Sequence, residues 1–215
     1  MDTTIFTFAE VNNSNASLIK SATFMFKATD KSTLSASYYG GFRNPNIDDI
    51  GKIFSKNDAD VIIPNENLEP EYADNFELVF KFDKKKLHVE TALFYTFISN
   101  AIKREYGTLN GIDSITYDGE LMRVQMNKNI ESAAIKGINL SGVYYPNKHL
   151  SFSANYNYLI GRTANDKALA HIPPINAKLS AKYIFKKHEI EFYTNYNAIK
   201  KAEDYDESGV DNFEE

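Results

Sequence analysis

The chain has 215 residues, a formal net charge of −5 and neither cysteine nor tryptophan. The lack of cysteine excludes disulfides, thiolate-bound zinc, iron–sulfur clusters and a cysteine nucleophile. Acidic residues outnumber basic ones by 29 to 24, which argues against a nucleic-acid partner because such proteins present a basic surface. No apolar run approaches the roughly 18 residues that a membrane-spanning helix needs.

The composition is rich in residues of strands and turns. The chain contains 15 Phe, 14 Tyr and 22 Asn, and aromatic residues favour strands whereas Asn favours turns and solvated faces. Apolar and polar residues alternate along about eight segments, which is the period of a half-buried strand. The sequence therefore predicts strands at roughly 18–28, 33–42, 73–82, 87–106, 119–145, 150–163, 175–185 and 188–198.

The alternation gives each predicted strand one apolar and one polar face. In segment 150–158, the apolar side carries Leu150, Phe152, Ala154, Tyr156 and Tyr158, and Ser or Asn occupies the positions between them. In the long segment 119–145, the polar side carries Arg123, Gln125, Asn127 and Glu131. Lys128 and Lys136 fall on the apolar side of that segment, and the pattern does not explain them.

The links between predicted strands are alternately short and long. The short ones are 29–32, 83–86, 146–149 and 186–187, and the long ones are 43–72, 107–118, 164–174 and 199 to the end. All short links would then lie at one edge of the sheet. The expected fold is an all-β, antiparallel up-and-down meander of about eight strands across residues 1–215.

Two architectures fit these alternating strands. A soluble sandwich or barrel buries its apolar face, whereas an outer-membrane barrel turns that face toward lipid and its polar face toward the lumen. The small, amide-rich polar face, the unequal links and the tyrosine pairs at strand ends (Tyr38-Tyr39 and Tyr144-Tyr145) favour the membrane barrel. A passive outer-membrane porin or adhesin, and a soluble secreted β-sandwich that binds sugars, remain as alternative readings.

Two sequence boxes carry a family resemblance. The first reads Phe42-Arg43-Asn44-Pro45-Asn46, and the second reads Asn65-Glu66-Asn67-Leu68-Glu69-Pro70-Glu71. This order resembles the barrels of TonB-dependent outer-membrane receptors, which carry an F-R-x-P box and then an N-x-x-L-x-P-E box before the next strand. The later Asn100-Ala101-Ile102 and Gly137-Ile138 also follow the family order. The sequence is similar to receptors of Bacteroidetes.

The resemblance implies a piece of a 22-stranded transmembrane β-barrel in the bacterial outer membrane. The intact parent would take up a scarce nutrient of the siderophore–iron, cobalamin or glycan class, captured at extracellular loops. Its partners would be outer-membrane lipid, a plug domain and the TonB protein. Neither a plug nor a TonB-binding box is visible in this chain, so the fragment is not expected to transport by itself. Related haem receptors tend to place a haem-ligating histidine between the two boxes, and residues 47–66 contain none.

The resemblance also assigns expectations to single residues. The box residues are expected to pack the loop rather than to contact ligand, with Arg43 as an anchor that folds the loop over the rim; they are Phe42, Arg43, Pro45, Asn46, Asn67, Leu68, Pro70 and Glu71. Arg123, Gln125, Asn127 and Glu131 are expected to face the plug or the solute. No serine-hydrolase elbow, phosphate loop or ligand-spaced histidine cluster occurs, so neither an enzyme nor a cofactor or metal site is predicted.

Overall fold

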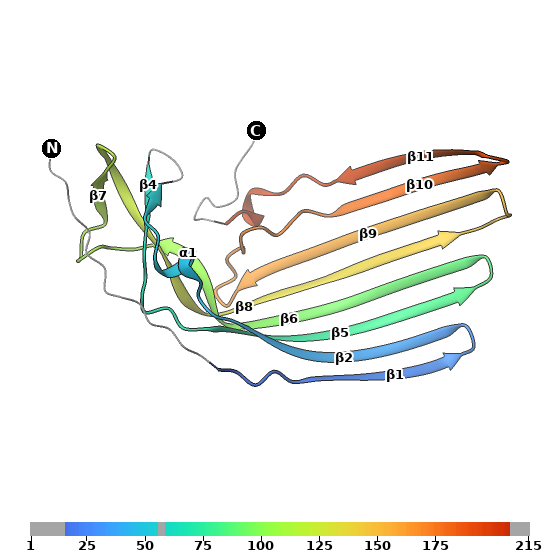
Figure 1. The fold of residues 1–215 in the computed structure, drawn as a ribbon, viewed down its shortest axis with the longest axis horizontal. Coiled ribbons are helices and arrows are strands. Elements are labelled where there is room, and N and C mark those ends of the chain that lie inside the picture. The colour runs from blue at the N-terminus through green and yellow to red at the C-terminus, as the bar shows by residue number, and fades with distance from the viewer. Residues whose placement is uncertain (1–15, 56–58, 207–215) are drawn as a thin grey trace. The chain divides into compact units, whose positions relative to one another are not determined.

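In the computed structural model, residues 16–55 and 59–206 are described, except for the side chain of Glu131. Eight long strands follow one another in the sheet in the same order as in the chain (Figure 1). They are β1 (Ser21–Thr29), β2 (Ser32–Arg43), β5 (Glu71–Lys84), β6 (Leu87–Tyr106), β8 (Glu120–Tyr144), β9 (Leu150–Thr163), β10 (Asn176–Phe185) and β11 (His188–Asn197). The all-β, antiparallel meander predicted from the alternation is confirmed.

Three short strands and two short helical turns complete the described residues. They are α1 (Ile47–Ile50), β3 (Phe54–Ser55), β4 (Asp60–Ile63), β7 (Ser114–Tyr117) and the 3-10 turn η1 (Ala202–Asp204). The expected count of about eight strands omitted β3, β4 and β7, because segments of two to four residues are too short to show a period. No helix among the described residues is long and apolar enough to cross a bilayer.

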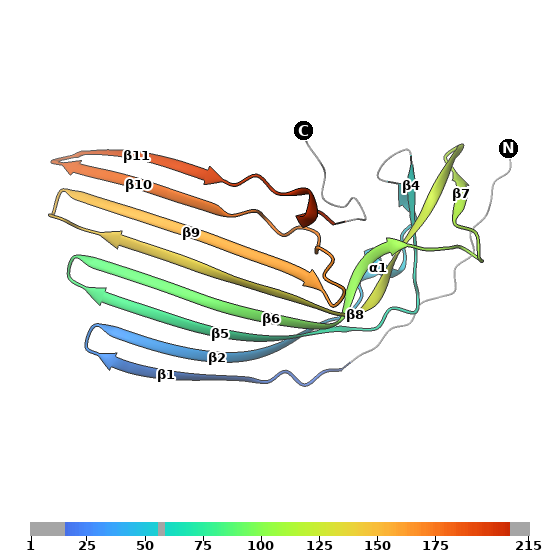
Figure 2. The same cartoon turned by 180° about the vertical axis from the view of Figure 1, so that it is seen from behind.

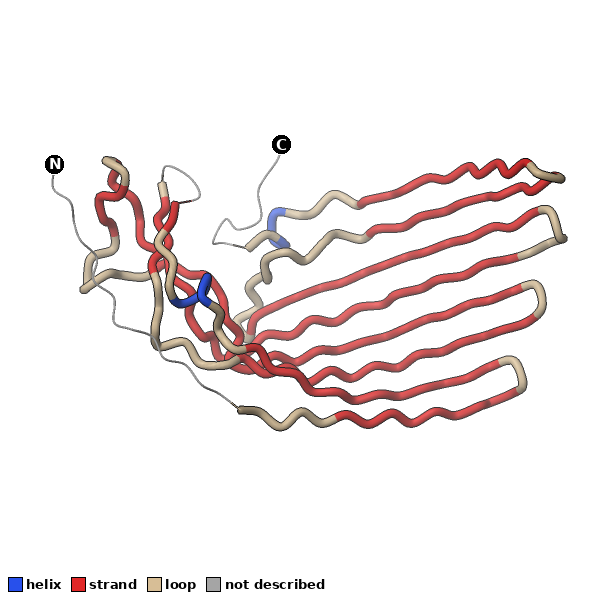
Figure 3. The backbone as a smooth tube through the Cα atoms, viewed as in Figure 1, coloured by secondary structure: helices blue, strands red, loops and turns tan. Residues whose placement is uncertain are grey.

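The chain divides into two compact units. Over the described residues, the loop unit denotes 16–18, 42–55, 59–72 and 99–131, and the strand unit denotes Ile19–Gly41, Ala73–Ile98 and 132–206. The strand unit contains the four hairpin turns that join β1 to β2, β5 to β6, β8 to β9 and β10 to β11. These turns lie at one end of the strand unit (Figures 2 and 3), as the short links predict.

The apolar face of the strand unit is exposed. The exposed fraction is 42% for Phe80, 44% for Phe152 and 76% for Phe192. A soluble sandwich would bury these three rings against a second sheet. In the described residues no such covering layer exists, so the apolar face needs an environment other than water.

The pairing register of β8 to β11 places apolar side chains opposite one another, so that they form rows across the four strands. Tyr144 pairs with Phe152, Phe152 with Ala181, and Ala181 with Phe192. Nearer the long loops, Tyr156 pairs with Leu140 and Ala177, and Ala177 pairs with Tyr196. The apolar rows therefore have tyrosines toward both ends, which is the arrangement of aromatic girdles at the two surfaces of a bilayer.

The opposite face of the strand unit is polar and lines a hollow of about 620 Å³. Its walls come from six neighbouring strands, β1, β2, β5, β6, β8 and β9, and include Ser37, Glu77, Glu90, Asn139 and Asn155. Cross-strand contacts tie this face together: Ser153 and Ser180 hydroxyls lie 2.8 Å apart, and Lys81 pairs with Glu90 at 2.8 Å. The two faces of the sheet thus differ as the alternation predicts.

Candidate functional site in the loop unit

The loop unit has its own hydrophobic core, formed where β4 lies parallel to β8. Residues 60–63 pair with residues 123–126, and the buried cluster consists of Val61, Ile63, Met122 and Val124. Ile53, Leu109, Ile115, Tyr117 and Met126 pack around this cluster. The core holds the segment between the two sequence boxes against β8, so this segment is a packed structure over its described residues.

The first box ends in a capped helical turn. The Asn46 side chain accepts hydrogen bonds from the backbone N–H of Asp48 and Asp49, at 2.8 and 3.0 Å. In return, Asp49 Oδ2 accepts one from the Asn46 N–H at 3.0 Å. This reciprocal capping box satisfies the free donors at the start of α1, and Pro45, which is buried, directs the chain into it.

Arg43 holds the two boxes together. Its Nη1 donates to Asp49 Oδ2 at 2.8 Å, and its Nε donates to Glu71 Oε1 at 2.7 Å. The second oxygen of Glu71 accepts a hydrogen bond from the backbone N–H of Ile102 in β6, at 2.9 Å. One guanidinium thus joins the end of β2 to α1 and to the start of β5, as a planar fork with several donors allows.

Electrostatics keep this cation charged. Partial burial lowers the pKa of Arg43, but the hydrogen bonds and negative charges of Glu71 and Asp49 outweigh burial and raise the pKa above the ordinary arginine value. Arg104, on β6, shows the opposite balance: burial lowers its pKa, and the charge of Asp49 offsets this only in part. Its guanidinium lies over the Phe54 ring at 5.7 Å.

The second box is fixed by asparagine side chains. Leu68 is buried, with 4% of its surface exposed. Asn129 accepts from the Glu69 N–H at 2.8 Å and donates to the carbonyl oxygens of Glu69 and Asn100, at 3.0 and 2.8 Å. Asn65 donates to the Asn127 carbonyl at 2.8 Å. Such amide-to-backbone bonds serve an irregular segment in place of a strand ladder.

The remaining box residues take simple packing positions. The rings of Phe42 and Tyr72 stack with their centroids 6.4 Å apart, and Asn67 is exposed while Pro70 is half-buried. Every described contact of the box residues is with another part of the loop unit. These contacts support the interpretation that the box residues pack the loop, which stays a prediction.

The residues expected to face the plug or the solute differ from one another in exposure and in contacts. Arg123 is half-exposed, pairs with Asp60 at 3.2 Å and lies over the Tyr106 ring at 4.5 Å. Gln125 and Asn127 are buried, with 3% and 7% exposed, and Asn127 donates to Asp49 at 3.1 Å. These two side chains do not face open solvent, because β4 and α1 cover this stretch of β8. The Glu131 side chain lies outside the described residues.

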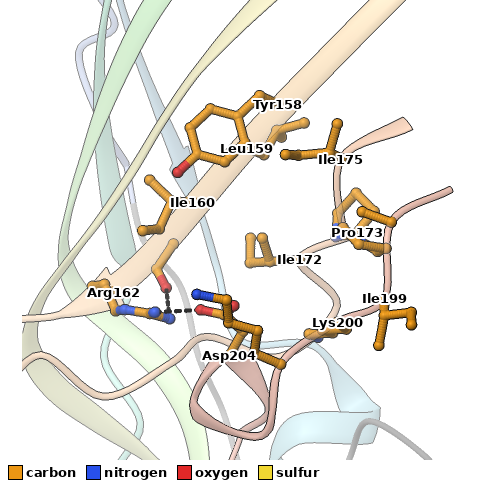
Figure 4. A pocket seen from close by; sticks show the side chains of 14 residues that line it. Tyr158, Leu159, Ile160, Arg162, Ile172, Pro173, Ile175, Ile199, Lys200 and Asp204 are labelled. Carbon is orange, nitrogen blue, oxygen red and sulfur yellow. Dashed lines mark hydrogen bonds and ion pairs between the residues drawn. The ribbon is translucent and has the colours of Figure 1, made fainter. Parts of the chain in front are cut away.

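A second hollow lies in the strand unit, beside the long-loop ends of β9, β10 and β11. It measures about 300 Å³ and is lined mainly by apolar side chains such as Ile160, Ile172 and Ile199. Figure 4 shows its polar corner, where Arg162 pairs with Asp204. At this corner the charge of Arg162 is matched by that of Asp204, and Lys201 of the lining pairs with Glu203.

The comparisons with known proteins decide the family. The family described as "TonB dependent receptor-like, beta-barrel" matches residues 2–213. The chain belongs to this family. The family resemblance carried by the two boxes is therefore confirmed, whereas the similarity to Bacteroidetes receptors stays a prediction.

Relatives of this receptor chain share its sequence over about four-fifths of its length. It is 27% identical over 178 residues, 78% of the chain, to the "Probable hemoglobin and hemoglobin-haptoglobin-binding protein 4" of Haemophilus influenzae. It is 30% identical over 188 residues, 80% of the chain, to "Hemoglobin-binding protein A" of the same species. The chain spans 18% of the length of each of these relatives.

Solved structures share its fold. A ferric enterobactin receptor from Pseudomonas aeruginosa superposes with a TM-score of 0.68 at 14% identity, covering 83% of this chain and 28% of that one. The "Copper transporter OprC" superposes with a TM-score of 0.66 at 17% identity, covering 83% of this chain and 26% of that one. The receptor chain therefore has the strand arrangement of about a quarter of such a protein.

Proposed function

We propose that this chain is part of an outer-membrane transporter that takes up a scarce, metal-bearing nutrient. The observation that carries the proposal is the polarity of the strand unit: an exposed apolar face with aromatic ends, and a polar face that lines a hollow. Membership in the TonB-dependent receptor family supports it. In this proposal the strand unit crosses the membrane, and the loop unit contributes to capturing the nutrient outside the cell.

The membrane location is supported by the unfavourable free energy of exposing the apolar face to water. Phe, Tyr, Leu and Ile side chains cover one face over eight adjacent strands, and monomeric soluble proteins rarely expose contiguous apolar patches above a few hundred Å². Lipid tails cover such a face without cost. The polar face then lies toward the lumen, where the plug domain of the intact receptor and the solute would meet Glu77, Asn139 and Asn155.

The proposed energy source follows the family. In the intact receptor, the TonB protein would couple the inner-membrane proton gradient to a movement of the plug. This chain contributes wall and loops to that cycle. An enzymatic role has no support in the arrangement of the described residues.

The relatives favour iron as the nutrient. Two of them are named for binding haemoglobin, and the solved neighbours include a receptor for ferric enterobactin. Residues 47–66 contain no histidine, which favours an iron chelate over haem. We expect a strain that lacks the receptor to grow poorly on a ferric siderophore as sole iron source and normally on haemoglobin. The reverse result would assign haem, and no growth defect on either would contradict an iron cargo.

The membrane location has a direct test in the intact receptor. Phe80→Arg places a charge on the apolar face, and Asn155→Arg places the same charge on the polar face. We expect the first change to cost about 2–4 kcal/mol of unfolding free energy in bilayers and the second much less. Unfolding by urea in lipid vesicles measures both. Equal costs would contradict the assignment of the faces.

A further inference from the structure

The hairpin turns of the strand unit carry a strong positive charge. The four turns and their flanking positions, residues 27–32, 83–88, 146–149 and 185–189, contain three acids, Asp30, Asp83 and Glu189. The same positions contain eight lysines, here called the turn lysines: Lys27, Lys31, Lys84, Lys85, Lys86, Lys148, Lys186 and Lys187. The whole chain has a net charge of −5, so this concentration of cations is a local property of one end.

The three acids of the turns already have partners. Asp30 pairs with Lys27 at 3.2 Å, Asp83 with His88 at 3.1 Å, and Glu189 with Lys182 at 2.7 Å. Within the described residues, seven of the eight turn lysines have no carboxylate partner, since only Lys27 pairs with one. Lys86 Nζ donates to the Pro146 carbonyl oxygen and Lys186 lies over Phe185, which leaves five exposed lysines: Lys31, Lys84, Lys85, Lys148 and Lys187. The charge of the turns is therefore available to an external anion.

The turn lysines lie directly beside aromatic residues at the end of the apolar face. Lys186 Nζ lies 5.3 Å from the centre of the Phe185 ring. The His149 ring lies 6.3 Å from that of Tyr183. Aromatic residues at this position mark the headgroup level of a bilayer. Lysines one or two residues farther along the chain then reach the level of the phosphates.

We propose that the turn lysines bind the phosphate groups of anionic phospholipid in the membrane leaflet at the hairpin end. The inference rests on the proposed outer-membrane location. Each lysine near an anionic lipid surface strengthens attraction by roughly fivefold in the association constant. Because the lysines belong to four adjacent hairpins, they present one row of charge across the sheet to one lipid surface.

A lipid surface fits these turns better than a carboxylate polymer or a protein does. The charges continue the apolar face without a gap, so the same bilayer would cover the aromatic rows and meet the lysines. The flexible, unpaired lysine side chains also lack the fixed fork geometry that recognises a single carboxylate. The partner defined by this chemistry is a mobile anionic headgroup on an acyl chain.

The test uses the intact receptor in detergent. We would titrate it with phosphatidylglycerol or phosphatidylethanolamine and take the ratio of the two association constants from native mass spectrometry. The variant K84Q/K85Q/K187Q removes three unpaired charges at the turns. The matched control K167Q/K200Q/K201Q removes three lysines from the long loops at the other end of the strand unit.

We expect the preference for phosphatidylglycerol to fall at least about fivefold in the turn variant, the effect of a single lysine, and to change little in the control. The preference should also weaken as salt rises. An unchanged ratio in the turn variant, or an equal fall in the control, would overturn the proposal. The proposal would also be overturned if the turn variant no longer bound purified cell wall while its lipid ratio stayed unchanged, because the partner would then be the carboxylate polymer.

The failure of this inference is distinguishable from that of the proposed function. A heat-modifiable gel shift reports whether the receptor and each variant form a folded barrel in lipid. A folded, inserted receptor without any preference for phosphatidylglycerol would overturn the lysine proposal alone. A receptor that does not insert at all would overturn the proposed function.

Discussion

At the scale of single residues, Arg43 has the most consequential contacts in the loop unit. Its guanidinium bridges Asp49 and Glu71, and Glu71 in turn accepts a hydrogen bond from Ile102. A single side chain therefore connects the end of β2 to α1, which follows it directly, and to the start of β5, which lies 28 residues farther along the chain. Because its pKa is raised by these carboxylates, it stays charged at every physiological pH.

Arg43→Met removes this bridge while keeping much of the side-chain volume. We expect the amide hydrogens of α1 to exchange roughly fivefold faster, equivalent to about 1 kcal/mol, since the arginine is partly solvent-screened. Hydrogen exchange with mass spectrometry measures the change. The control Lys52→Met removes the exposed pair with Asp48 and should leave α1 unchanged; equal effects would show that the bridge does not hold the loop.

The role of Arg43 as a loop anchor stays a prediction, and the sequence did not predict its partners. A motif places Arg43 and Glu71 at the two ends of a long link, yet nothing in the sequence pairs them with Asp49 or Ile102. The side-chain hydrogen bonds of Asn65 and Asn129 join residues that are about 60 positions apart in the sequence. Such pairings follow from the folded path of the chain and leave no periodic signal.

At the scale of elements, β8 joins both kinds of structure seen in the described residues. Its first part packs against β4 and β7 in the loop unit, and its later part pairs with β9 in the strand unit. The alternation predicted β8 as a long strand. It did not predict β4, because four residues that are all buried show no contrast between faces.

Packing of β4 on β8 should stabilise the loop unit. Ile63 is 2% exposed, whereas Ile112 in the neighbouring turn is 58% exposed. We expect Ile63→Ala to cost about 2–5 kcal/mol of local stability through lost burial and a residual cavity. Ile112→Ala should cost much less. Protease cleavage within the loop unit, compared between the two variants, reports the difference, and equal rates would contradict the proposed core.

Two glycines of β8 offer a matched test of close packing in the strand unit. A Cβ on Gly137 would overlap the Tyr158 carbonyl oxygen and lie 2.7 Å from Phe94 Cζ, whereas on Gly142 its nearest contact would be 3.5 Å away. We therefore expect Gly137→Ala to destabilise the protein by about 1–3 kcal/mol and Gly142→Ala to have little effect. Urea unfolding in vesicles compares them; equal stabilities would show that the sheet adjusts freely.

At the scale of the whole molecule, the described chain has two unpaired strand edges. β1 pairs only with β2, and β11 pairs only with β10. Together with the uncovered apolar face, these edges provide sites for further strand pairing and for hydrophobic association. The alternation predicted this exposure correctly, because a face lined with Phe and Leu opposite Ser and Asn has only lipid or a second layer to cover it.

We accordingly expect the 215-residue chain, expressed alone, to aggregate or to form oligomers in plain buffer. Detergent should shift it toward smaller species by covering the apolar face. Analytical ultracentrifugation with and without detergent measures the distribution. A clean monomer in plain buffer would contradict the exposed face, and it would indicate a compact, water-soluble arrangement of these strands.

The strict one-in, one-out register of β8 to β11 also limits how the gene is able to change. Inserting or deleting one codon inside these strands would swap the two faces from that point onward and move Ser and Asn side chains to the apolar face. The long links tolerate length changes without that penalty. Among genes that diverge from this one, insertions and deletions should therefore concentrate in the links. The number of residues within each strand should stay constant.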